Sequence, residues 1–131
     1  MSNWTHVAGV IRVDDMRVSW VKPLDFESLI GKEIQLGYPM EVFEDAEKHP
    51  EKYLPMGSEG SLQMTVWENP DKNSIDAYTI TIFGDLRDHD NPQEIVEWFK
   101  NVCGKFTVRN ATIIAENEEF GIANWCSGYT L

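Results

Sequence analysis

Residues 84–90, Gly-Asp-Leu-Arg-Asp-His-Asp, hold the densest group of reactive side chains in the chain. Their carboxylates and the imidazole of His89 are ligand types for a divalent metal, which could activate water for hydrolysis. The same residue types are also favoured just before a helix, where Asp accepts hydrogen bonds from free backbone N–H groups and suits the helix dipole. We favour this second interpretation, with Arg87 in a structural ion pair. A metal-assisted hydrolase that uses Asp85, Asp88 and His89 is the alternative.

The segment that follows carries the signals of a helix. Asn91 is expected to cap its N-terminus, Pro92 suits the first helical position, and Gly104 should end it, so the sequence predicts a helix over 92–103. One stripe of this helix is apolar and should be buried: Ile95, Phe99, Val102 and Cys103. Cys103 is therefore predicted to be a core residue and not a nucleophile.

Strands are predicted where apolar and polar residues alternate: over 4–14, 61–68, 75–83 and 106–117, with residues 121–131 as an edge strand or a packed tail. The long region 16–59 is interrupted by Pro and Gly, so it should hold only short helices, over 24–30 and 41–48. The order of elements predicts one α+β domain over 1–131. We expect a ferredoxin-like split β-α-β sandwich, an antiparallel sheet with helices on one face and an elaborated first connection.

The alternation also predicts what lies on the sheet face away from the helices. If the apolar residues of each strand line the core, large aromatic rings and hydrogen-bonding groups must point the other way. The candidate ligand- or partner-binding residues are Trp4, His6, Arg12, Trp67, Thr81 and Phe83, with Arg87 and Arg109 as anion contacts. The alternatives are that this face is a dimer interface, or is covered by region 16–59 or by the C-terminal tail with Trp125 and Tyr129.

Composition narrows the classes of function. The chain has 22 acidic and 11 basic residues and a formal charge of −11, which disfavours direct binding to nucleic acid. It contains no stretch of about 20 apolar residues and no signal-peptide pattern, so we expect no membrane contact and a cytoplasmic location. A phosphate-binding glycine loop, a Gly-x-Ser-x-Gly motif and a Cys-x-x-Cys pair are all missing, so no enzyme class is indicated and no cofactor is expected.

Four short motifs resemble a set of small, uncharacterised proteins of tailed phages and prophages. They are Trp4-Thr5-His6; Gly9 followed by Ile11, Val13 and Asp14; Gly-Ser-Glu-Gly at 57–60; and Gly-Asp-Leu-Arg-Asp at 84–88. The resemblance touches the strands and leaves the middle region unmatched. It implies a phage or prophage protein acting inside a bacterium, and brings no activity with it.

These observations lead to a functional hypothesis. We expect a non-enzymatic binding protein, a homo-oligomer, that blocks a component of host defence or sequesters a nucleotide-like signal. Its partner would be a host protein or a small nucleotide-like ligand. Besides the metal-assisted hydrolase, a structural role in the virion is a further alternative.

Overall fold

The computed structural model describes residues 2–15, 24–70 and 76–128 and shows an α+β protein built on one antiparallel sheet. Its strands are β1 (Trp4–Asp15), β2 (Gln63–Glu68), β3 (Asp76–Arg87), β4 (Val108–Asn117) and β5 (Gly121–Ser127). Its helices are α1 (Phe26–Ile30), α2 (Met40–Lys48), the short 3-10 helix η1 (Pro50–Lys52) and α3 (Pro92–Cys103). In the part of the chain described, no helix is long and apolar enough to cross a membrane.

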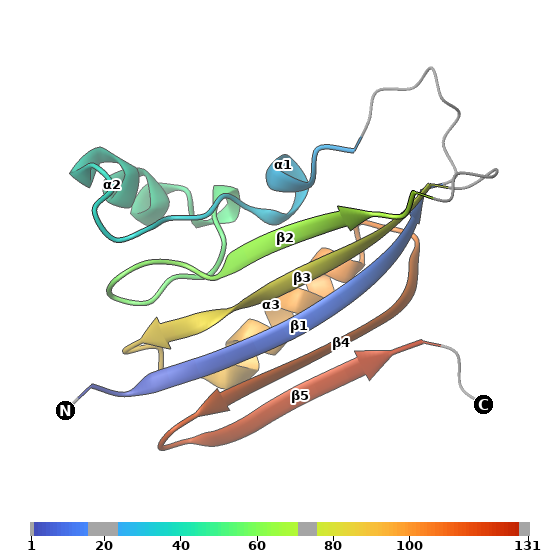
Figure 1. Cartoon of the computed structure of the whole chain (residues 1–131). Helices are drawn as coiled ribbons and strands as arrows, with labels where there is room; N and C mark the ends of the chain where they lie inside the picture. The colour runs from blue at the N-terminus through green and yellow to red at the C-terminus, as the bar shows by residue number, and fades with distance from the viewer. Residues whose placement is uncertain (1, 16–23, 71–75, 129–131) are drawn as a thin grey trace.

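The strand order is β2-β3-β1-β4-β5, so the first strand of the chain lies in the middle of the sheet (Figure 1). β1 pairs along its whole length with β3, with Ile11 opposite Ile80, and pairs on its other side with β4, with Gly9 opposite Ile113. The register puts the apolar residues of neighbouring strands on one face. This confirms the alternation that the sequence predicts for β1 and β3.

Helix α3 crosses behind the sheet and supplies the centre of the core (Figure 1). Phe99, which has no exposed surface, packs near Gly9, where a Cβ atom would lie 3.0 Å from its ring. Ile30 and Leu54 from the long first connection join the same core. Cys103 is buried there too, and burial raises the pKa of its thiol to about 11, as expected for a core cysteine.

The helix signals are confirmed. The Asn91 side chain accepts a hydrogen bond from the backbone N–H of Glu94, and α3 begins at Pro92 and ends before Gly104. α1 and α2 lie within one or two residues of the two short helices that the sequence predicts. β4 begins two residues later than predicted.

The segment with the densest reactive side chains differs from its prediction. Gly84–Arg87 continues β3, and the turn before α3 begins only at Asp88, which has a positive φ of 58°. The sequence places the end of this strand at Phe83 because Gly84 and the charges after it are typical of a turn. Pairing with β1 overrides that local tendency, since Trp4, Thr5 and His6 extend the ladder to Arg87.

A buried group of polar side chains closes this end of the sheet. Thr5 and Asn117 are almost fully buried, and the Asn117 amide donates to the Thr5 hydroxyl at 2.9 Å and to the His89 carbonyl at 3.2 Å. The Thr5 hydroxyl itself donates to the same His89 carbonyl. Because the Asn117 side-chain oxygen also accepts from the N–H groups of Glu119 and Phe120, one residue links β1, the start of α3 and the β4–β5 turn.

We predict that Asn117→Ala lowers the free energy of unfolding by about 2–4 kcal/mol, because it leaves buried donors and acceptors without partners. Urea denaturation followed by circular dichroism measures this change. Asn101→Ala, at an exposed position of α3, is the matched control and should change stability by less than about 0.5 kcal/mol. Equal stability of the two variants would show that the buried group does not fix this corner.

Candidate binding face

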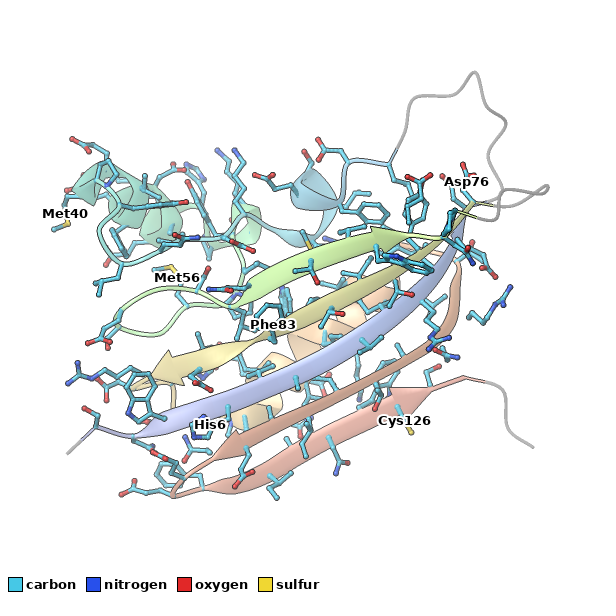
Figure 2. All side chains as sticks on the ribbon, in the orientation of Figure 1. His6, Met40, Met56, Asp76, Phe83 and Cys126 are labelled. Carbon is cyan, nitrogen blue, oxygen red and sulfur yellow. The ribbon has the colours of Figure 1, made fainter. Side chains whose placement is uncertain are left out.

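The face of the sheet opposite α3 carries the candidate residues, as the alternation predicts. Figure 2 looks onto this face, with His6 on β1, Phe83 on β3 and Cys126 on β5. We call it the open face, and its side chains come from all five strands: Gln63, Thr65 and Trp67; Thr79, Thr81, Phe83, Asp85 and Arg87; Trp4, His6, Ala8, Val10 and Arg12; Asn110, Thr112, Ile114 and Glu116; Ile122, Asn124 and Cys126.

Large apolar groups on the open face remain accessible to solvent. Trp67 is 56% exposed, Ile114 44% and Ile122 60%. Trp4 and Phe83 are half-buried, so they lie at the surface and not in the interior. The face is therefore a mixed surface, on which exposed apolar side chains lie among hydroxyl, amide and charged groups.

Within the described residues, region 16–59 reaches only one corner of this face, where Glu59 and residues 34–36 lie beside Trp4 and Arg87. Ile30 and Leu54 pack with α3 on the opposite side. Trp125 also points to that side, where its ring meets Phe99 edge-on with centroids 6.0 Å apart. Tyr129 lies outside the described residues.

Two of the short sequence motifs meet at one corner of the open face. The loop 57–60 docks against the end of β3, and Glu59 forms an ion pair with Arg87. A Cβ atom on Gly57 would lie 2.6 Å from the backbone N and O of Arg87, so only glycine fits at this contact. The Ser58 hydroxyl donates to Asp88 at 3.2 Å, which fixes the loop from its other side.

This corner and the adjoining strands are slightly hollowed. One depression of about 390 Å³ lies between Trp4, Arg87, Gln63 and the loop 57–60. A second, of about 330 Å³, lies over His6, Phe83 and Ile114. Both are open to solvent and shallow, which suits a protein surface better than it suits a small molecule that must be enclosed.

His6 is held between two carboxylates. Its Nδ1 lies 2.7 Å from Asp85 Oδ1 and its Nε2 lies 3.4 Å from Glu118 Oε2, while the backbone N–H of Trp4 donates to the same Glu118 carboxylate at 3.1 Å. The hydrogen bond to Asp85 is the main reason that the pKa of His6 is raised above its ordinary 6.5. Glu118 acts in the same direction, and partial burial opposes both. At the His6 end of the open face, one imidazole thus lies between the carboxylates of Asp85 and Glu118.

The arginines that the sequence assigns to anion binding do not form one cationic site. Arg87 is paired with Glu59, and Arg109 lies beside the bulge of β4 with its Nε 3.2 Å from Asp14. Arg12 is exposed and lies near Arg109, at the end of the face away from Arg87. Thr81 lies between the two ends, opposite Val10 on β1.

The residues of the metal hypothesis point in different directions. Asp85 contacts His6 on the open face, Asp88 contacts Ser58 and Asn3, and His89 lines a separate cavity beside α3. Among the residues that the structure describes, no three His, Cys, Asp or Glu side chains form a group that could hold a metal ion. The geometry therefore gives the hydrolase alternative no support.

Sequence reasoning missed several residues of the open face. Glu59 and Glu118 contact Arg87 and His6 from distant parts of the chain, and no local pattern links them. Ile114 could have been found, because the alternation in residues 106–117 places it on the side opposite Ile113. Ile114 and Ile122 are exposed isoleucines on adjacent strands of this face.

Comparisons with known proteins add no relative: no family model, no curated protein and no solved structure matches the chain. The resemblance to phage proteins thus stays a prediction.

We predict that an NMR titration of the His6 ring gives a pKa above 6.5, and that Asp85→Asn lowers it more than Glu118→Gln does. The pKa of His6 is higher in the folded chain than in the unfolded chain, so protonated His6 stabilises the fold. This contribution is full below pH 6.5 and is lost as the pH rises through the folded pKa. The His6 side chain is 45% exposed, so screening keeps the effect under about 1 kcal/mol. A His6 pKa that both substitutions leave unchanged would contradict the ion-pair geometry.

Proposed function

We propose that this chain is a non-enzymatic binding protein that holds a partner protein on its open face. The observation that carries the proposal is the exposure of Trp67, Ile114 and Ile122 on a sheet face that no other described element covers. Protein interfaces combine such apolar and aromatic residues with hydrogen-bonding groups, and here threonines, Arg12 and the carboxylates around His6 lie between the apolar side chains.

Charge indicates the kind of partner. Asp85, Glu116 and Glu118 surround His6, and the whole chain carries a formal charge of −11. A partner that presents basic groups opposite this end of the face would be attracted and oriented by these carboxylates. A nucleotide-like ligand is less favoured, because Glu59 and Asp14 already neutralise Arg87 and Arg109.

The finer features expected from the sequence remain part of this proposal. The order β2-β3-β1-β4, antiparallel throughout, supports a ferredoxin-like arrangement to which β5 adds an edge strand. In this arrangement the connection between β1 and β2 is elaborated, because α1 has only five residues and α2 packs beside η1 instead of on the sheet. If the resemblance to phage proteins is correct, the protein acts in the bacterial cytoplasm and its partner is a component of host defence.

The open face can be tested with a pair of charge substitutions. Ile114→Asp places a carboxylate at its centre, and Met40→Asp places the same group on exposed α2, away from the sheet. The wild-type chain and the Met40→Asp variant should capture the same protein from a bacterial lysate, measured by quantitative mass spectrometry. Ile114→Asp should lose it, because a charge would be buried in an apolar interface.

Once the captured protein is purified, Trp67→Ala should weaken its binding by roughly tenfold or more in calorimetry, as expected for an aromatic anchor. Binding should also weaken with added salt. Equal capture by Ile114→Asp and Met40→Asp would exclude the open face, and a nucleotide that co-purifies in place of a protein would favour the ligand alternative. Circular dichroism of each variant checks that the fold is kept.

A further inference from the structure

The two edges of the sheet differ in how they are protected. At the outer edge of β2, the backbone N–H of Met64 donates to the Glu33 carboxylate at 2.8 Å, and the N–H of Leu62 donates to the Pro55 carbonyl at 3.0 Å. The first connection thus occupies the start of this edge. In the described part of the chain, β5 pairs with β4 alone, and no element pairs with its other side.

The register identifies which backbone groups of β5 point outward. The N–H of Glu118 donates to the carbonyl of Trp4, one residue beyond the Thr5–Asn117 pair at the end of the β1–β4 register. Backbone groups alternate in direction along a strand, so the even-numbered residues of β4 face β1 and the odd-numbered ones face β5. The odd-numbered residues of β5 lie opposite these odd-numbered residues of β4, so their backbone groups are used in the β4–β5 pairing. The N–H and C=O groups of Ile122, Asn124 and Cys126 therefore point to the outer edge.

β5 carries none of the features that keep an edge strand from pairing. It has no proline, its register with β4 has no bulge, and none of its seven residues, Gly121–Ser127, is charged. This is notable in a chain where a quarter of the residues are charged and acids outnumber bases two to one. Exposed neutral edge strands of this length are templates for pairing with another strand.

We propose that β5 is a dimerisation edge at which two copies of this chain join their sheets. Antiparallel pairing about a two-fold axis through Asn124 uses the whole strand, with Asn124 opposite Asn124 of the second copy and Ile122 opposite its Cys126. A second copy fits this edge because β5 of one chain would lie opposite β5 of the other, and neither strand has a charged residue. No like charges therefore come together in the pairing, although each chain carries a formal charge of −11. The pairing also places the exposed Ile122 against an uncharged neighbour.

This dimer goes beyond the proposed binding function and does not depend on it. Joining the two sheets edge to edge leaves both open faces free and on the same side, because the two-fold axis is perpendicular to the sheet. The dimer would thus present two copies of the binding surface to one partner or to two.

The register gives a direct test with the full-length chain. Residues opposite each other in a hydrogen-bonded antiparallel pair have Cα atoms about 5.5 Å apart, which a disulfide can span. Ile122→Cys should therefore form intermolecular disulfides with the native Cys126 of the second copy under mild oxidation, seen on a non-reducing gel. Within one chain, residues 122 and 126 lie about 13 Å apart along an extended strand, too far for a disulfide. Thr65→Cys on β2 is the matched control and should stay monomeric on the gel.

Solution measurements complete the test. Sedimentation equilibrium of the wild-type chain should give twice the 15.0 kDa monomer mass. Asn124→Pro removes an N–H that points outward and should raise the dissociation constant by about tenfold or more, whereas Asn124→Ala should leave it nearly unchanged. A monomeric wild-type chain would overturn the proposal. So would a dimer that neither cross-links through Ile122→Cys nor responds to Asn124→Pro, because its interface would lie elsewhere.

Discussion

The register of β1 between β3 and β4 is the constraint on which the two faces of the sheet depend. A shift by one residue would turn His6 and Arg12 into the core and expose Ile11 and Val13. The buried hydrogen bonds of Thr5 and Asn117 oppose such a shift, since the Asn117 amide reaches both the Thr5 hydroxyl and the His89 carbonyl only in the observed pairing. The same bonds fix the start of α3. This polar contact inside the protein thus supports the register that keeps His6 and Arg12 outside it.

Much of the fold could be predicted because its signals are local. Alternation in residues 4–14 and 75–83 assigns each side chain of β1 and β3 to a face, and Asn91-Pro92 with Gly104 marks both ends of α3. The continuation of β3 to Arg87 could not be predicted, because it depends on pairing with β1, whose residues precede their partners by 77 to 83 positions. The position of the first connection was equally hidden, since its contacts with the core are made by single residues such as Ile30 and Leu54.

For the candidate site, too, the local pattern could be predicted but the contacts between distant residues could not. The sequence identifies Trp4, His6, Trp67 and Phe83 as members of one face, which follows from alternation alone. It does not reveal that Asp85 leaves the supposed metal cluster to contact His6, or that Arg87 is neutralised by a loop at Glu59. Both facts change the chemistry of the surface. Asp85, a supposed metal ligand, becomes a partner of the His6 imidazole, and the candidate anion contacts Arg87 and Arg109 become members of ion pairs.

The burial of Cys103 gives the chain an uneven pair of thiols. A pKa of about 11 keeps the Cys103 sulfur protonated at neutral pH, so reagents that attack thiolates meet a poor nucleophile that they also cannot reach. Cys126, exposed on β5, is the other cysteine. In the native protein a fluorophore or a spin label should therefore react at Cys126 alone. Such a label would lie on β5, the strand of the proposed dimer contact.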